Sequence, residues 1–380
     1  MHCGHRSERH LAITVLFLTG CSGSPADLPD REAPAPDAGI ASDGGAVSDA
    51  GGDADASTPA DAGPTRQGEP IWAEAMGTPR GEVRWGTRLI YVPGEERFVL
   101  FGGFAYPIGD VLSDTWSLSA RDGTWTEITT QGDVPAPRYC HCATYLPTTH
   151  QLLLVGGRGD AGPLPPAAWT LDLATGTWTS IAAPVPPGVI GCAAEWMPNI
   201  GRAIVYGGAG RSLYQDTYAY DPAARAFAPV ATVTQAPPGR SDAPQFYDPV
   251  GGKLYVFSGV VRAFPPFEVR EDLWAFDGTD WSLVETATTP PPRRYSATAY
   301  DPIGARWYMF GGTDGPSDLE DLWAFDPAAR TWTRLDLPDA PTARAFSASA
   351  YDPVADAMLF IGGFTVDYRG LRDGWHLKFQ

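Results

Sequence analysis

Five arginines recur at one repeated position of the chain, where together they could bind an anion. Each stands seven residues before an aromatic that ends a short apolar stretch, and only the third copy differs, with Val189. The guanidinium is a planar fork of donors that matches a carboxylate or a phosphate. If the copies surround an axis, these groups would form an anion-binding ring at one end of a channel; alternatively, each bonds backbone carbonyls or a neighbouring aspartate and fixes a loop. The five are Arg84, Arg138, Arg240, Arg293 and Arg344.

Three cysteines beyond residue 21 could form a disulfide, remain as thiols or bind a metal. Cys192 aligns with His141, and Cys140 and Cys142 flank that histidine one copy earlier. If neighbouring copies run side by side, a disulfide between Cys142 and Cys192 is feasible, and it would persist in an oxidising compartment. A metal site fits less well, because residues 140 and 142 of a strand face one side and His141 the other. We expect no metal and no other cofactor, and the sequence offers no recognisable catalytic set.

The elements that must position these residues are repeated short strands. An apolar run that ends in Gly-Gly, or once in Ser-Gly, occurs six times at intervals of 51 to 54 residues. An aromatic and a proline turn precede each run, as in Tyr300-Asp301-Pro302, and two further aromatics follow it, the first usually within Asp-x-Trp. The turns divide each repeat into four strands, which we name a to d. Four-stranded repeats about fifty residues long are typical of propeller blades.

The two ends of the repeat region are predicted to complete one sheet. The sixth repeat stops at Gln380, just past Trp375, and lacks its strand d. The missing strand is present near Trp72, where the sequence matches strand d of the first repeat at residues 124–127. We therefore predict an all-β, six-bladed β-propeller with four antiparallel strands per blade, closed by an N-terminal strand in the last blade. Closure removes free sheet edges, and the repeated aromatics are expected to pack between blades.

The repeats resemble the kelch repeat, with its apolar run, Gly-Gly, Asp-Leu-Trp and Thr-Trp. The resemblance covers about 310 residues and implies a propeller similar to the central domain of galactose oxidase. It also implies that the loops joining strands b and c share one face with the loops joining strand d to the next strand a, and that partners bind there. Copper ligands like those of galactose oxidase-like enzymes are not recognisable among His141, His150 and His376. The periplasmic sialic acid mutarotases are kelch propellers with arginine-lined sites, so a mutarotase-like or other carbohydrate-active enzyme is the alternative function.

The b–c loops are the most variable part of the repeats, and they carry candidate binding residues. Aromatic side chains beside arginines are enriched at the centres of protein interfaces. We therefore expect a module that binds a protein or a glycan through its b–c and d–a loops. The alternative is that the b–c loops are unstructured additions without a binding role. The loops span residues 104–110, 158–166, 209–214, 260–271, 313–319 and 364–372, and the candidates are Arg158, Arg211, Phe264 and Arg270.

The start of the chain is predicted to be an export signal followed by a lipid attachment site. Arg6 and Arg9 precede a short apolar run at residues 11–18, too short to span a bilayer. Residues 18–21 then resemble the bacterial lipobox, in which Cys21 is lipidated; an ordinary secretory signal with an incidental cysteine is the alternative. In the lipoproteins that this segment resembles, an aspartate after the lipidated cysteine often signals retention in the inner membrane, so the resemblance, with Ser22 at that position, implies the outer membrane. We expect an exported protein held at a bacterial membrane by lipid alone.

Composition separates a spacer from the propeller and excludes one class of partner. Residues 22–68 hold no aromatic side chain and consist mainly of Ala, Asp, Gly, Pro and Ser, which predicts a disordered tether. The domains are thus 1–20 signal peptide, 21–68 lipidated cysteine and tether, and 69–380 propeller. A formal net charge of −18 argues against nucleic-acid binding, which needs a basic face. The propeller is expected to be a monomer.

Overall fold

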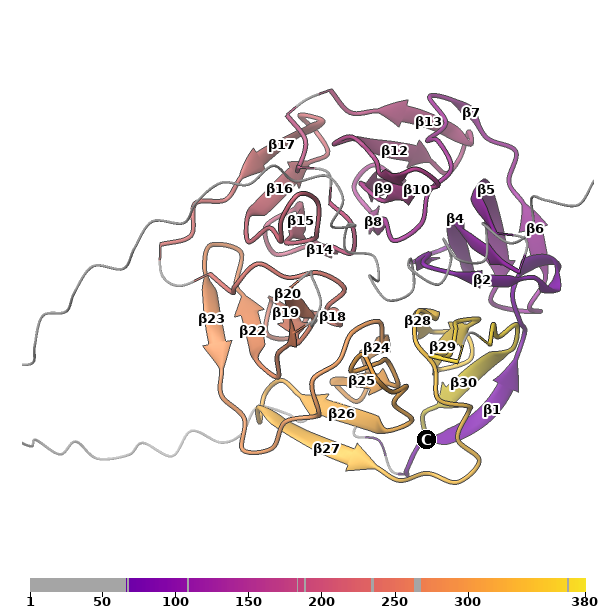
Figure 1. Cartoon of the computed structure of the whole chain (residues 1–380), viewed down its shortest axis with the longest axis vertical. Coiled ribbons are helices and arrows are strands. Elements are labelled where there is room, and N and C mark those ends of the chain that lie inside the picture. The colour runs from indigo at the N-terminus through magenta and orange to yellow at the C-terminus, as the bar shows by residue number, and fades with distance from the viewer. Residues whose placement is uncertain are drawn as a thin grey trace, which may run out of the picture.

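The computed structural model describes residues 66, 68–107, 109–182, 184–187, 189–233, 236–262, 268–367 and 369–380. The predicted signal peptide, Cys21 and nearly all of the predicted tether lie outside these residues. The repeats form six sheets, four of them with four strands and two with five. These sheets surround a common axis (Figure 1). Within the described part of the chain, no helix is long and apolar enough to cross a membrane.

Each blade contains strands a to d in order from the axis outward. Blade 1 is β3 (Leu89–Val92), β4 (Arg97–Tyr106), β5 (Asp110–Ser119) and β6 (Trp125–Glu127), and β2 (Val83–Trp85) pairs with the end of β4. Blade 2 is β8 (Cys142–Leu146), β9 (Gln151–Val155), β12 (Ala168–Asp172) and β13 (Thr177–Ser180), and β7 (Gln131–Gly132) runs parallel to β13. Blade 3 is β14 (Ala193–Met197), β15 (Arg202–Tyr206), β16 (Thr217–Asp221) and β17 (Ala226–Pro229).

The remaining blades repeat the arrangement. Blade 4 is β18 (Gln245–Asp248), β19 (Lys253–Phe257), β22 (Leu273–Phe276) and β23 (Trp281–Val284). Blade 5 is β24 (Ala297–Asp301), β25 (Arg306–Phe310), β26 (Leu322–Asp326) and β27 (Thr331–Leu335). Blade 6 is β28 (Ala348–Asp352), β29 (Ala357–Ile361), β30 (Gly374–Lys378) and β1 (Ile71–Ala75). Two small hairpins, β10 (Arg158–Gly159) with β11 (Gly162–Pro163) and β20 (Val260–Arg262) with β21 (Glu268–Val269), lie in b–c loops.

The ring closes as the sequence predicts. β1 pairs antiparallel with β30, and Trp72 stands opposite Leu377 in the register. The Trp72 ring also packs across the blade boundary, with its centroid 5.0 Å from that of Phe310 in blade 5. Both ends of the repeat region therefore lie in one sheet, and the prediction of a six-bladed propeller closed by an N-terminal strand is confirmed.

Aromatic side chains of strand d pack against the preceding blade, as expected. Trp178 of blade 2 contacts Phe101 of blade 1 with ring centroids 5.1 Å apart, and Trp332 of blade 5 contacts Phe257 of blade 4 at 5.3 Å. Apolar clusters of this kind lie between each pair of neighbouring blades. The core is thus divided into six interfaces rather than concentrated at the axis.

The Gly-Gly pair forms a joint between consecutive blades. The backbone N–H of Gly103 donates to the carbonyl of Arg138 in the next blade at 2.9 Å, and a Cβ on Gly102 would lie 2.6 Å from that oxygen. Both glycines have positive φ, so close approach and backbone conformation each favour glycine. At the one exception, Ser258-Gly259, the N–H of Gly259 still donates to the carbonyl of Arg293 at 3.1 Å, and the Ser258 hydroxyl also accepts a hydrogen bond from the backbone N–H of Arg293 at 2.7 Å.

Candidate functional site

The b–c and d–a loops form one continuous face, which we call the loop face. In blades 2 to 6 a residue of the preceding d–a loop forms a β-bridge with the start of the blade's own b–c loop, as between Ser241 and Val260. In blade 1 the same contact is extended into the pairing of β2 with β4. The loops that differ most in sequence are therefore attached to the repeated framework at six equivalent places.

The five recurring arginines lie beneath this face, buried within their own blades. The exposed fraction of each residue is 2% or less. Each guanidinium donates to the carbonyl of the residue 18 positions later, at the first residue of the Gly-Gly or Ser-Gly pair. These bonds join Arg84 to Gly102, Arg138 to Gly156, Arg240 to Ser258, Arg293 to Gly311 and Arg344 to Gly362, at 2.8 to 3.2 Å.

Four of these arginines are also paired with the aspartate that opens strand c. Arg293 donates to both carboxylate oxygens of Asp321, and Trp323 donates its indole N–H to the same carboxylate at 2.7 Å. Burial opposes ionisation of Asp321, but the hydrogen bonds from Arg293 outweigh it and hold the pKa of this carboxyl below its usual range. The other pairs are Arg84 with Asp114, Arg240 with Asp272, and Arg344 with Asp373.

Blades 2 and 3 each lack one half of this pair. Arg138 has Ala167 where the other blades have the aspartate, and its guanidinium instead lies 4.1 Å from the ring centroid of Trp169. Burial lowers the pKa of Arg138 to about 10. Blade 3 retains the acid, Asp216, but has Val189 in place of the arginine.

These contacts correct the hypothesis of an anion-binding ring. The donors of the five guanidiniums bond carbonyls and carboxylates of their own blades, and none of the five lines either of the axial cavities described below. Their geometry matches the alternative raised from the sequence, in which each arginine fixes a loop. The repeated arginines are structural residues.

The candidate residues of the b–c loops differ in accessibility. Arg158 is 5% exposed, and its backbone pairs with that of Tyr139 under the loop face. Arg211 and Arg270 are exposed. Phe264 lies outside the described residues. Of the four candidates, two are therefore placed where a partner could reach them.

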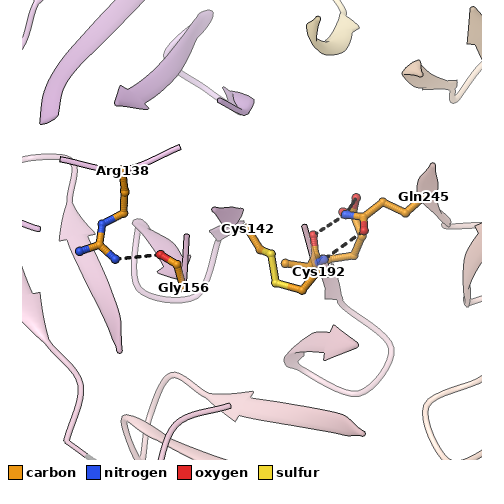
Figure 2. The surroundings of a disulfide bond; sticks show 7 residues. Arg138, Cys142, Gly156, Cys192 and Gln245 are labelled. Carbon is orange, nitrogen blue, oxygen red and sulfur yellow. Dashed lines mark hydrogen bonds between the residues drawn. A yellow bond between two sulfur atoms is a disulfide. The ribbon is translucent and has the colours of Figure 1, made fainter. Parts of the chain in front are cut away.

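Cys142 and Cys192 form a disulfide that joins strand a of blade 2 to the start of blade 3, with the Cα atoms 5.7 Å apart (Figure 2). Beside it, the amide of Gln245 donates to the carbonyl of Ala194 at 3.0 Å and accepts from its N–H at 3.2 Å. His141 is buried, and burial together with Arg138 and Arg88 lowers the pKa of its imidazole to about 3. Among the described residues, no cluster of histidine, cysteine and acidic side chains is arranged to hold a metal.

A second candidate site lies on the propeller axis. A cavity of about 410 Å³ extends along strands a to the a–b turns, where Pro93 and Pro147 line it. The aromatic that ends strand a contributes to its wall in all six blades, and each of these side chains is half-buried. They are Tyr91, Tyr145, Trp196, Tyr247, Tyr300 and Tyr351. We call this cavity the axial pocket.

The inner end of the axial pocket is charged. Arg88 and Gln245 line both the pocket and a smaller cavity of about 50 Å³ beyond it, next to Asp242. Glu195 lines the pocket beside them and accepts a hydrogen bond from Gln245 at 3.3 Å. Burial raises the pKa of Glu195 to about 7 and that of Asp242 to about 6, although Arg88 lowers both.

Towards the loop face, backbone and aromatic side chains close the space around the propeller axis. Residues at one repeated position, all with positive φ, are joined by backbone hydrogen bonds between consecutive blades from Gly86 in blade 1 to Phe346 in blade 6, for example from the N–H of Tyr295 to the carbonyl of Asp242 at 3.1 Å. The rings of Tyr295 and Phe346 stack with centroids 3.6 Å apart, and Trp85 packs against Phe346 at 4.9 Å. The charged inner end therefore lies between an aromatic cap and the axial pocket.

Comparison with known proteins agrees with this architecture. A family model for the KLHDC2/KLHL20/DRC7 kelch-repeats domain matches residues 74–244 and 202–380. The chain belongs to the kelch-repeat family. The kelch resemblance seen in the sequence is thereby confirmed.

Curated relatives of this kelch propeller share only part of their length with it. An N-(sulfonatooxy)prop-2-enimidothioate sulfolyase of Thlaspi arvense is 32% identical over 27% of this chain and 30% of its own. Multiple epidermal growth factor-like domains protein 8 of Rattus norvegicus is 25% identical over 69% of this chain and 10% of its own. The Rab9 effector protein with kelch motifs of Mus musculus is 27% identical over 53% of this chain and 54% of its own.

The sequence held a signal for the axial residues that reasoning from the kelch repeats missed. Arg88 aligns with Cys142, Ala193, Pro244, Ala297 and Ala348, and Glu195 aligns with Ile90, Thr144, Phe246, Ala299 and Ala350. A charged side chain that replaces small or apolar residues at a repeated position breaks the pattern of the repeat. Residues that break the pattern identify the pocket better than residues that follow it.

Proposed function

We propose that this kelch propeller is a protein-binding module that presents its loop face to a partner, while a lipid on Cys21 holds it at a bacterial membrane. The observation that carries the proposal is the attachment of every variable b–c loop to the d–a segment beside it. A rigid scaffold that supports variable loops on one face is a common design for recognition. The exposed Arg211 and Arg270 belong to these loops.

A protein is the partner we favour. The mouse relative is named as a Rab9 effector protein with kelch motifs, that is, as a protein that acts with another protein. Arginines at the centre of an interface often contribute most of its binding energy. A glycan partner is the other outcome of the test below, and we propose that the propeller binds as a monomer.

The course of the chain supports presentation of the loop face away from the anchor. β1 is antiparallel to β30 and begins opposite Lys378, on the side of the a–b turns. Just before it, Arg66 bonds Asp301, at the end of β24, and Asp356, in the a–b turn of blade 6. Arg66 therefore lies on the face opposite the loop face, and we propose that the chain from Cys21 arrives there.

The loop face is tested by comparing variants of the two faces in one binding experiment. The full chain, an Arg211→Ala/Arg270→Ala variant and an Arg330→Ala control at the opposite c–d turn would each be immobilised and exposed to envelope extract and to a glycan array. We expect a bound protein that is retained by the wild type and the control and is lost from the double variant. If the double variant retained the bound protein and the control lost it, the proposal would be contradicted. Binding of glycans alone would identify the partner as a glycan instead of a protein.

The anchor is tested separately by fractionation of cells that express the chain. Cys21→Ser is expected to move the protein from the membrane fraction to the soluble periplasmic fraction, because the acyl chains would be missing. Cys140→Ser is the matched control and should remain in the membrane fraction. Membrane association of Cys21→Ser equal to that of the wild type would contradict lipidation at this residue.

A further inference from the structure

The geometry points to a second binding site in the axial pocket, for a small ring compound that carries a carboxylate. We infer that Arg88 binds the carboxylate and that the six strand-a aromatics contact the ring. This site lies on the opposite side of the axial cap from the loop face, and it does not depend on the protein partner proposed above.

Arg88 has the donors that an anion would use. Its guanidinium lies where the axial pocket meets the smaller cavity, and it makes no hydrogen bond or ion pair with the part of the chain that the structure describes. The five recurring arginines, in contrast, all donate hydrogen bonds to carbonyls of their own blades. A guanidinium carries five N–H donors, and the half-buried Arg88 has no acceptor for them in the described chain. A bidentate carboxylate would satisfy two of these donors.

The nearby carboxyls leave Arg88 available. Asp242 accepts hydrogen bonds from Ser241 at 2.9 Å and from the Tyr295 hydroxyl at 3.0 Å. Glu195 accepts from Gln245 instead. Neither carboxyl has a hydrogen bond with Arg88, although Arg88 lowers the pKa values of both, which burial raises to about 7 for Glu195 and about 6 for Asp242.

The walls of the pocket select a ring-shaped body. Its volume of about 410 Å³ lies within the range of about 300–1,000 Å³ common for small-molecule sites. Five tyrosines and one tryptophan present flat, amphipathic surfaces at half-buried positions around it. Because the aromatic cap closes the loop end, a ligand would enter past the a–b turns with its carboxylate foremost.

The test is a titration of the full chain with two ring carboxylates and their neutral counterparts. Benzoate and glucuronate are the probes, and benzyl alcohol and glucose are the controls; binding is measured by calorimetry and by tryptophan fluorescence. We expect at least one acid to bind, with its neutral counterpart at least about tenfold weaker. Preference for benzoate would indicate an aromatic acid as the natural ligand, and preference for glucuronate a sugar acid; either result supports the proposal.

Two variants make the test specific to Arg88. Arg88→Gln should weaken binding of the acid at least about tenfold, while Arg211→Gln on the loop face should bind as the wild type does. If Arg88→Gln does not fold, as judged by thermal unfolding, Glu195→Gln provides the decision: loss of a competing carboxylate should strengthen binding. No binding of either acid up to about 10 mM, wild-type affinity in a folded Arg88→Gln, or unchanged or weakened binding in Glu195→Gln would overturn the proposal.

Discussion

Arg293 donates two hydrogen bonds to Asp321, at 2.6 Å from Nη1 to Oδ1 and at 2.8 Å from Nη2 to Oδ2. The arginine side chain is completely buried and the aspartate side chain is 12% exposed. The same pair recurs in three other blades. The pair connects the start of strand c to the d–a loop that precedes the same blade. Both segments adjoin the variable b–c loop, so the pair helps to hold that loop in place.

Replacement of Asp321 by alanine should strongly destabilise the propeller. The change leaves the buried Arg293 guanidinium without its counter-charge, which typically costs about 3–5 kcal/mol. Urea unfolding followed by tryptophan fluorescence would measure the loss. Asp336→Ala is the matched control, because its ion pair with Arg334 is exposed on both sides and should contribute less than about 1 kcal/mol. Equal effects of the two substitutions would show that the buried pair has no special role.

The same pair predicts a loss of stability in acid. The pKa of Asp321 is held below its usual range, so its contribution is complete above the unfolded-state value of about 3.9 and is lost as pH falls through the folded value. Asp321→Ala should therefore lose less stability than the wild type when the pH is lowered from 5 to 3. Parallel curves for the two proteins would be inconsistent with this account.

The disulfide between Cys142 and Cys192 should stabilise the contact between blades 2 and 3. The two residues are 50 positions apart. A disulfide that closes a loop of that length lowers the entropy of the unfolded chain and so raises its free energy by about 4 kcal/mol. The Cys142→Ser/Cys192→Ser double variant should therefore unfold at a lower denaturant concentration under oxidising conditions. Identical midpoints for the variant and the wild type would indicate that the bond does not form in solution.

Arg66 should hold the chain before β1 against blades 5 and 6. It bonds the buried carboxylate of Asp301 at 2.7 Å and that of Asp356, and its guanidinium lies 5.1 Å from the ring centroid of Phe379. Arg66→Ala is expected to cost about 1.5–3 kcal/mol, as for hydrogen bonds to charged groups. Arg270→Ala, which breaks an exposed pair with Glu268, should have a much smaller effect in the same unfolding assay. A reversed order of the two would contradict the role of Arg66.

Glu195 should make stability decrease as pH rises towards neutrality. Burial raises its folded-state pKa to about 7, so the folded protein binds this proton more tightly than the unfolded chain does. Stability is therefore lost as pH rises from the unfolded value, about 4.3, to about 7. Between pH 5 and pH 8 the wild type should lose stability relative to Glu195→Gln, in which Arg88, Gln245, Asp242 and His141 remain. A constant difference between the two proteins would mean that Glu195 is not perturbed.

The sequence was sufficient to predict the fold because the repeat spacing determines it. Six runs with their turns and aromatics specify six sheets, and the incomplete sixth repeat together with the segment near Trp72 predicts the closure. Each of these patterns can be recognised within a few consecutive residues, so the fold can be predicted without knowing any contact between distant residues. The kelch family assignment rests on the same residues.

The roles of individual side chains were harder to predict, because they depend on contacts between distant residues. The partner of Arg293 lies 28 residues away, and a repeated arginine alone fits both an anion ring and a structural pair. One clue was present in the sequence, since most repeats that have the arginine also have the strand-c aspartate. The charged end of the axial pocket gave no such clue to a search for repeated residues, because Arg88 and Glu195 each occur in one repeat only.

Closure of the ring by β1 completes the sixth blade and places both ends of the repeat region in one sheet. Hydrogen exchange of the full chain, read at the amides of residues 71–75, tests it most directly. We expect the amides of this segment that pair with β30 to exchange as slowly as those of the inner strand β29. Exchange of all of them at the rate of an unstructured peptide, in a protein whose β29 is protected, would contradict it.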